Sequence, residues 1–318
     1  MFGSSLLGRP RLPRRPQRLT PLLLAAGCGR LAFDPAAVAD HADATGELAR
    51  DAAPTASGCD PTAPFGVPVA IAELNTSSAL DGTLRLLPDE LSGYFWSYRN
   101  GGQGDLFFAH RADLQSPFAV MTLSGVNTAT NEIDPTISSD GTLLLYRKNS
   151  PGDDLWMATT TPSTPTQLTG ATAIAALNST SADAQPYLQP GGNEVIFTSS
   201  RTGNSDLYRT IRTGTSFSPP TRIAELATSF EEGDPVLTAD GKTLVFRSTR
   251  PAPFSDYNIY VATRASTADP FGAAVLVENV NTDREDGPSA LSADGCRLYL
   301  SSDRAGTNDV YVARRGSP

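Results

Sequence analysis

The sequence has few of the side chains on which catalytic and metal sites usually depend. Only two histidines and three cysteines occur among its 318 residues. It contains no G-x-S-x-G elbow, Cys-x-x-Cys pair, calcium-loop spacing or phosphate-binding loop. No single motif therefore predicts a hydrolase triad, a resident metal or a cofactor.

Basic residues and long apolar runs are also scarce. The chain has 25 lysines and arginines against 34 acids, which gives a net charge of −9. Five of the arginines and no acid lie in the first 28 residues, so the charge without that segment is −14. Such a charge repels nucleic-acid phosphates and anionic lipid headgroups. No later segment approaches the roughly 20 apolar residues that a spanning helix needs, so we expect membrane attachment only through a lipid anchor.

The N-terminus has the pattern of an export signal. The arginine-rich segment precedes an apolar run, Leu19–Ala26, and the sequence Ala-Ala-Gly-Cys ends at Cys28. This pattern resembles the lipobox of bacterial lipoproteins. The resemblance implies a signal peptide at 1–28, a lipid anchor on Cys28 and a place in the cell envelope, on the outer membrane or the periplasmic side. Ordinary secretion and a cytosolic chain are the alternatives.

The segment after the signal has no sustained periodicity. Residues 29–62 are rich in Ala, Asp and Pro and include His41. This composition predicts a flexible tether, in which a lone histidine is solvated. The folded domain is expected at 63–318.

Self-similar units fill this domain. Five units follow one another at a period of about 51 residues. Their first strands are expected to begin at Thr83, Pro135, Pro186, Pro235 and Pro288, with spacings of 52, 51, 49 and 53 residues. This regularity leaves little room for another domain.

Each unit has the pattern of four antiparallel strands. The first strand runs into a tight turn, such as SSDG at 138–141, in which Asp-Gly tolerates the positive φ of a hairpin. The second strand, such as VIFTSS at 195–200, is apolar on both faces, so we expect both faces to be buried. Five such sheets predict an all-β, five-bladed β-propeller. Its blades are expected at about 83–127, 135–178, 186–227, 235–281 and 288–314.

The repeat can be compared with a known family. Its order of Pro, Leu-Ser-x-Asp-Gly, an aromatic strand ending in Ser-x-Arg, a Gly-bearing turn and Asp-Leu-Tyr resembles the PD40, or WD40-like, repeat of TolB-type propellers. The likeness covers about 250 of the 318 residues. It implies the fold, and it does not imply the role of TolB itself, because TolB has six blades and a separate N-terminal domain.

The last unit ends at Arg314 without a fourth strand. A matching segment, 65–75 (FGVPVAIAELN), precedes the first unit and resembles the fourth-strand segment 271–281 (FGAAVLVENVN). We therefore expect 65–75 to complete the last blade and close the ring. Cys59 would then face Cys296, because six residues reach about 20 Å and three strand spacings span roughly 14 Å. A Cys59–Cys296 disulfide is predicted, with two free thiols as the alternative.

Two sets of charged residues recur in the units. Cations that end the second strands precede polar residues that begin the third strands, which predicts structural hairpin pairs Arg99–Asp105, Arg201–Asp206 and Arg304–Asp309. Acids also lie just before the first strands, at Asp81, Asp134, Asp234 and Asp286. These acids predict an acidic channel mouth for a cation such as calcium, a sugar or a basic peptide, with simple turn caps as the alternative.

These patterns favour a monomeric, non-enzymatic envelope protein that binds or scaffolds another protein. The alternative is a propeller that binds or hydrolyses polysaccharide, in which two carboxylates act as acid and base or nucleophile. A Ser-His-Asp triad is not expected. The one histidine of the domain, His110, stands where the other units have Thr159, Ile211, Thr263 and Arg314.

Overall fold

The computed structural model describes residues 58–149, 152–254 and 256–316. The predicted signal peptide, the Cys28 anchor and residues 29–57 of the predicted tether lie outside these ranges. Within them every regular element is a β-strand, and there is no helix with the length and apolar character needed to cross a membrane.

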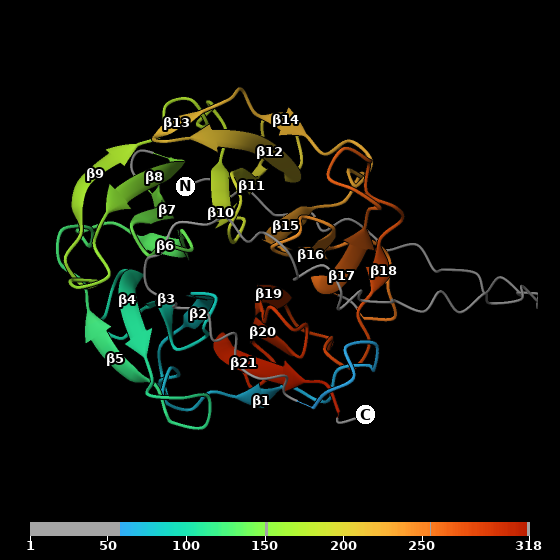
Figure 1. Cartoon of the computed structure of the whole chain (residues 1–318), viewed down its shortest axis with the longest axis horizontal. Coiled ribbons are helices and arrows are strands. Elements are labelled where there is room, and N and C mark those ends of the chain that lie inside the picture. The colour runs from blue at the N-terminus through green and yellow to red at the C-terminus, as the bar shows by residue number, and fades with distance from the viewer. Residues whose placement is uncertain (1–57, 150–151, 255, 317–318) are drawn as a thin grey trace, which may run out of the picture. The chain divides into compact units, whose positions relative to one another are not determined.

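The strands form five sheets, which Figure 1 shows arranged in a circle. Blade 1 contains β2 (Asp81–Leu86), β3 (Ser92–Ser97), β4 (Asp105–His110) and β5 (Ala119–Thr122). Blade 2 contains β6 (Glu132–Ile137), β7 (Leu143–Asn149), β8 (Asp153–Thr159) and β9 (Thr169–Ala173). Blade 3 contains β10 (Asp183–Leu188), β11 (Glu194–Ser199), β12 (Asp206–Thr213) and a divided outer strand, β13 (Ser216–Phe217) and β14 (Thr221–Arg222).

The last two blades follow the same order. Blade 4 contains β15 (Glu232–Leu237), β16 (Thr243–Ser248), β17 (Asn258–Thr263) and β18 (Val275–Leu276). Blade 5 contains β19 (Asp286–Leu291), β20 (Arg297–Ser302), β21 (Asp309–Arg314) and, on its outer edge, β1 (Val69–Ala70). The innermost strands β2, β6, β10, β15 and β19 contact one another in turn, and β19 contacts β2. The predicted five-bladed propeller is confirmed.

A bulge gives the innermost strands their shape. In four blades the third residue has a positive φ, at 45° for Thr83, 53° for Asp134, 51° for Gln185 and 46° for Asp234. The register of each strand with its neighbour shifts at this point. Asp and Gln tolerate this conformation poorly compared with Gly, so the ring imposes it. The bulge turns the third side chain toward the neighbouring innermost strands.

The turns after the innermost strands also match the sequence pattern. Gly141, Gly241 and Gly295 adopt φ of 69° to 70°, as an Asp-Gly hairpin requires. In the first blade the left-handed position is taken by Glu90, with φ 58°. Its side chain is buried and lies against blade 5, so a ring contact compensates for the unfavourable backbone.

The N-terminal segment closes blade 5 as predicted, although its strand is short. Val69 and Ala70 pair with Val312 and Tyr311 of β21, and Phe65 forms an isolated bridge with Arg315. The Phe65 ring is buried in a cluster that includes side chains of blade 4. The Arg315 guanidinium lies 4.0 Å from the centre of that ring.

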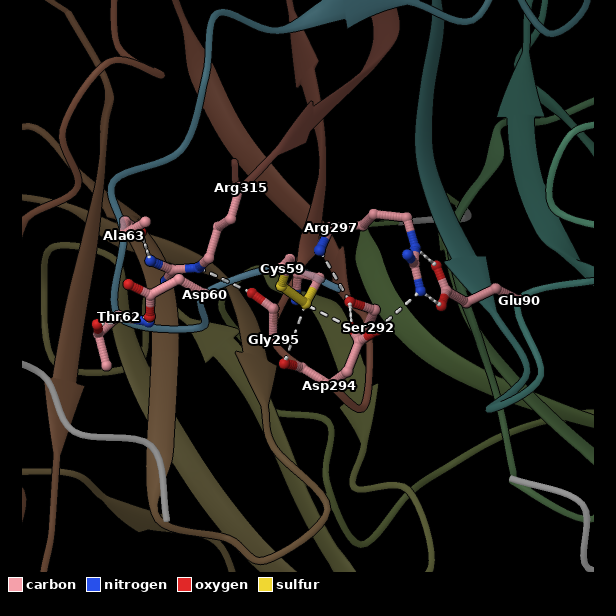
Figure 2. The surroundings of a disulfide bond; sticks show 11 residues. Cys59, Asp60, Thr62, Ala63, Glu90, Ser292, Asp294, Gly295, Arg297 and Arg315 are labelled. Atoms are coloured by element: carbon pink, nitrogen blue, oxygen red, sulfur yellow. Dashed lines mark hydrogen bonds and ion pairs between the residues drawn. A yellow bond between two sulfur atoms is a disulfide. The ribbon is translucent and has the colours of Figure 1, made fainter. Parts of the chain in front are cut away.

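The predicted disulfide between Cys59 and Cys296 is present, with a sequence separation of 237 residues (Figure 2). Beside it the backbone N–H of Asp60 donates to the Gly316 carbonyl at 3.1 Å. Arg315 donates to the carbonyls of Gly295, at 2.9 Å, and Ala63. These contacts hold the start of the domain against the end of the chain.

A second contact closes the seam between blades 5 and 1. Arg297 of β20 binds both carboxylate oxygens of Glu90, through Nε at 2.8 Å and Nη2 at 2.7 Å (Figure 2). The Tyr299 hydroxyl donates to the same carboxylate at 2.8 Å. A bidentate, buried pair is among the stronger polar contacts in proteins, and it joins residues 207 positions apart in the sequence.

Loss of the disulfide should weaken the closed ring. The loop-entropy relation allows up to about 5 kcal/mol for a loop of this length, so Cys59→Ser should lower the free energy of unfolding by a few kcal/mol. Urea unfolding with and without reductant measures this change. The wild-type chain should respond to reductant and Cys59→Ser should not. Equal unfolding midpoints for all four samples would show that the disulfide adds nothing.

Candidate functional site

Each innermost strand begins with a buried carboxylate that pairs with a cation from the end of the second strand. The five pairs are Asp81–Arg99 (3.0 Å), Glu132–Lys148 (3.0 Å), Asp183–Arg201 (2.6 Å), Glu232–Arg250 (3.1 Å) and Asp286–Arg304 (2.6 Å). All five carboxylate side chains are fully buried. We call these pairs the blade clamps.

Each clamp also holds the segment that crosses from the preceding blade. The carboxylate accepts hydrogen bonds from the backbone N–H and the hydroxyl of one residue in that segment, namely Thr76, Thr128, Ser179, Thr228 or Thr282. The four arginines donate in addition to the backbone carbonyls of Leu74, Leu177, Leu226 and Val280. The clamp therefore joins two successive blades.

The predicted hairpin pairs had the right cations and the wrong partners. Arg99 bonds the Ser97 hydroxyl through Nε, at 2.8 Å, and turns toward β2 rather than toward Asp105 on β4. Asp105 accepts a hydrogen bond from Asn100 instead, at 2.8 Å. In the register of blade 1, Ser97 lies between Asp81 and Asp105, so either acid was within reach.

The same correction applies to the other two predicted pairs. Arg201 and Arg304 bind the clamp carboxylates of their blades, and Asp206 pairs with Arg222 of the outer strand at 2.8 Å. Asp309 has no ion pair among those found in the described residues. Burial raises the pKa of Asp309, and the charge of Asp81 adds to the shift.

The acids predicted at the channel mouth fall into two groups. Asp81 and Asp286 are clamp residues with fully buried side chains, so they do not line an open mouth. Asp134 and Asp234 lie two positions further along their strands, at the bulge, where they reach neighbouring blades. Asp134 accepts a hydrogen bond from the Thr83 hydroxyl of blade 1, at 3.2 Å, and the backbone N–H of Asp234 donates to Gln185 of blade 3, at 3.1 Å.

Arginines accompany both channel acids. Arg147 Nε lies 3.0 Å from Asp134 Oδ2, and Arg247 Nε lies 3.0 Å from Asp234 Oδ2. Burial raises the pKa of Asp234, while Arg247 opposes the shift and the charge of Asp134 adds to it. The predicted acidic channel mouth was wrong here, because the sequence pattern did not place the side chains of Arg147 and Arg247, which come from second strands and pair with these acids.

A third arginine crosses the centre of the ring. Arg85 of β2 is 2% exposed, donates to the Ser289 carbonyl of β19 and lies 4.8 Å from the Tyr187 ring centre of β10. Its Nε and Nη2 have no hydrogen-bond partner among the described residues. Burial lowers the pKa of Arg85 and raises that of Tyr187 to about 12. We call Arg85, Asp134, Arg147, Asp234 and Arg247 the channel cluster.

Aromatic and apolar side chains surround the mouth above this cluster. The Tyr257 ring lies 4.2 Å from the Arg247 guanidinium, and its hydroxyl donates to Glu231. Tyr98 donates to Asn131 at 3.1 Å. Leu80 and Phe230, which precede two of the innermost strands, are 42% and 38% exposed. The described residues include no group of three or more His, Cys, Asp or Glu side chains placed to hold a metal ion.

Several residues of this site lacked a sequence signal. Arg85 contacts residues of blades 3 and 5, whereas Arg147 and Arg247 pair with the bulge acids of their own blades. Glu90 stands in a degenerate turn. One signal was available for the clamps. The segment before each acid repeats as Leu-Asn-Thr, Val-Asn-Thr, Leu-Asn-Ser, Leu-Ala-Thr and Val-Asn-Thr at residues 74–76, 126–128, 177–179, 226–228 and 280–282. Its asparagines bond the backbone of the preceding blade, as Asn75 does with Val310.

Comparisons with known proteins identify the fold. No protein-family model and no curated protein matches the chain. An endo-arabinase from Bacteroides thetaiotaomicron is 16% identical, with a TM-score of 0.52, and the match covers 79% of this chain and 97% of that one. An α-L-arabinofuranosidase from Podospora anserina is 13% identical, with a TM-score of 0.52, over 82% and 99% of the two chains.

A likeness to TolB is weaker. TolB from Acinetobacter baumannii is 17% identical with a TM-score of 0.45, and the match covers 77% of this chain and only 57% of that structure. The solved structures that resemble this chain therefore include glycoside hydrolases, at TM-scores of 0.52, and a protein titled TolB, at 0.45. At these identities the likeness shows the fold alone.

The clamps should matter for stability. Asp286→Asn leaves Arg304 without its charge partner in a buried setting, which should cost about 3 kcal/mol in the free energy of unfolding. Asp286→Glu is the matched control, because blade 4 builds its clamp from Glu232 and Arg250. Urea unfolding should place Asp286→Glu much closer to wild type. Equal, small losses for both variants would contradict a clamp that depends on charge.

Asp309 should give stability a pH dependence of known sign. Its folded-state pKa lies above the ordinary 3.8, so the folded chain binds more protons than the unfolded chain and loses stability as pH rises through this range. The variant Asp309→Asn cannot titrate at this position, so it should not lose stability in this way. Asparagine already occupies the equivalent position of blade 4, at Asn258. Its thermal midpoint relative to wild type should rise between about pH 3 and pH 6. A difference that is constant with pH would refute the assignment.

Proposed function

We propose that this chain is a non-enzymatic binding module that recognises another protein at the mouth of its propeller. The observation that carries the proposal is the pairing of both channel acids with arginines, at 3.0 Å each, below a mouth that bears exposed apolar side chains. Hydrolysis of a glycosidic bond needs one carboxylic acid that gives a proton and one free carboxylate that attacks or activates water. Arg147 and Arg247 place a guanidinium 3.0 Å from Oδ2 of Asp134 and of Asp234, so neither acid stands free to meet a substrate.

The centre of the channel also favours binding at the rim over hydrolysis inside the channel. Arg85 spans from blade 1 to blades 3 and 5, and its guanidinium is buried between Tyr187 and the Ser289 carbonyl. A substrate ring cannot occupy the same space. Binding to the rim needs no such space, and tyrosine, phenylalanine and arginine are the residue types that protein interfaces favour.

The proposed location is the bacterial envelope. The lipobox-like sequence ending at Cys28 supports a lipid anchor, and residues 29–62 would give the propeller reach. The disulfide between Cys59 and Cys296 supports an oxidising compartment. The repeats' resemblance to TolB-type propellers agrees with this location. We propose a monomer, either anchored by lipid or, as the alternative, secreted.

Glycoside hydrolysis is the second candidate, and one observation favours it. Asp134 and Asp234 come from different blades, and the charge of Asp134 contributes to the raised pKa of Asp234. Glycosidases use two carboxyl groups, and the one that acts as the acid has a raised pKa. In such an enzyme Asp134→Asn and Asp234→Asn would each abolish hydrolysis without unfolding the ring.

Site-specific photo-crosslinking in cells tests the proposed recognition of another protein. The full chain carries a photoreactive residue either at Phe230, on the mouth, or at Asp240, in a β-turn at the opposite end of blade 4. We expect one defined protein adduct from position 230 and none from position 240. Equal adducts from both positions would contradict recognition at the mouth.

The purified full chain is also assayed on arabinan and on aryl glycosides. We expect no hydrolysis above a blank. Hydrolysis that Asp134→Asn and Asp234→Asn both abolish would replace the binding module with the second candidate.

A further inference from the structure

Arg85 is the one charged residue at its position among the five innermost strands. In each blade this position is the first at which pairing with the second strand resumes after the shift in register. The five residues are Arg85, Thr136, Tyr187, Val236 and Ala290. All of them are buried. Because four blades pack without a charge here, the fold itself does not require the arginine, and a buried charge is costly unless a partner binds it.

The unpartnered atoms of Arg85 form one edge of its guanidinium. Nη1 donates to the Ser289 carbonyl, whereas Nε and Nη2 have no hydrogen-bond partner among the described residues. In a guanidinium the N–H groups of Nε and Nη2 point the same way and can bind two oxygens of one anion. Arg297 uses this edge on both oxygens of Glu90, at 2.8 and 2.7 Å. The corresponding edge of Arg85 therefore matches the two oxygens of a carboxylate.

The charges of the channel cluster do not balance. Each of its two aspartates pairs with the arginine of its own blade at 3.0 Å. Arg85 takes part in no ion pair among those found in the described part of the chain. Glu285 lies 3.8 Å from Nη1 of Arg247, but its side chain is 55% exposed, so solvent screens its charge. The cluster therefore holds one positive charge that its own acids do not neutralise.

The unpartnered atoms of the cluster are mainly donors. Among the described residues they are four arginine nitrogens, Nε and Nη2 of Arg85 with Nε of Arg147 and of Arg247, and one acceptor, Asp234 Oδ1. The last two Nε atoms lie 3.0 Å from aspartate oxygens but lack the alignment of a hydrogen bond. Buried N–H groups without an acceptor are costly. An anion supplies acceptors and negative charge together, whereas a metal cation supplies neither.

We infer that the channel cluster binds a small monovalent carboxylate on the Nε and Nη2 edge of Arg85. Two oxygens match the two parallel donors, and one negative charge matches the unbalanced positive charge. The Tyr187 ring, whose centre lies 4.8 Å from Cζ of Arg85, supports one face of the guanidinium. Both nitrogens are closed to solvent, which favours a free acid over a carboxylate carried by a partner protein. The inference goes beyond the proposed function, because it uses none of the exposed rim residues.

A titration of the full chain with isotope-labelled formate tests this site. Sodium chloride is exchanged for sodium formate at constant ionic strength in a non-ionic detergent, and broadening of the formate NMR signal reports binding. We expect saturable broadening with the wild-type chain. Arg85→Lys should weaken binding about tenfold, because lysine keeps the charge but loses the two parallel donors.

Two further variants separate the site from a loss of folding. Arg297→Lys loses the same kind of donor pair, at the seam with Glu90, so it should be less stable in urea and should bind formate as the wild type does. Asp234→Asn removes a negative charge that acts on Arg85. It should tighten formate binding about threefold, which is a gain that misfolding cannot produce.

A pair of competitors distinguishes the source of the carboxylate. Acetylated tetraglycine has a free C-terminal carboxylate, and its amide has none. A site for a free acid predicts that neither peptide displaces formate. Displacement by the carboxylate form alone would keep the carboxylate site and assign it to the chain terminus of a partner.

Three results would overturn the inference. The first is no saturable broadening with the wild-type chain, which would mean that water alone satisfies Arg85. The second is equal formate affinity of Arg85→Lys and wild type. The third is weaker binding by Asp234→Asn than by wild type. Crosslinking at Phe230 is independent of all three, so the carboxylate site and the proposed binding module can fail separately.

Discussion

The buried carboxylate that begins each innermost strand is the constraint on which the rest of the ring depends. Burying a charge is costly unless ion pairs and hydrogen bonds satisfy it. Asp286 meets this demand through Arg304, at 2.6 Å, and through the N–H and hydroxyl of Thr282. The three partners belong to the same blade and to the crossover that precedes it. Aspartate with arginine and glutamate with lysine serve equally in different blades, because the clamp needs opposite charges at one place rather than one residue type.

Blade 5 differs from the other four because the chain supplies its outer strand from the opposite end. β1 pairs through only two residues, Val69 and Ala70, so strand pairing alone closes the ring weakly. The disulfide, the Arg315 contacts and the Glu90–Arg297 pair reinforce this seam (Figure 2). They lie at the end of the ring where β19 turns into β20, whereas the clamps and the mouth lie where β19 begins. The closing contacts and the mouth therefore lie at opposite ends of blade 5.

The sequence predicted those features that local pattern determines. The repeat period of about 51 residues and the Asp-Gly turns predicted the five blades. The incomplete last unit predicted the closing strand and, with it, the Cys59–Cys296 disulfide. Alignment on the prolines treated Asp81 and Asp134 as equivalent, although the bulge puts them at different strand positions with different partners. Arg85 bonds a carbonyl 204 residues away, and nothing in its own unit indicates that contact.

Because each clamp joins two successive blades, the five blades should unfold as one cooperative unit. Hydrogen exchange at the backbone amides that donate to the clamp carboxylates tests this claim most directly. These are the amides of Thr76, Thr128, Ser179, Thr228 and Thr282. These amides lie in crossovers, where exchange is ordinarily fast. The account predicts that all five exchange as slowly as the amides of the innermost strands. Fast exchange at the crossovers beside protected strands would contradict it, since the blades would then be held by packing alone.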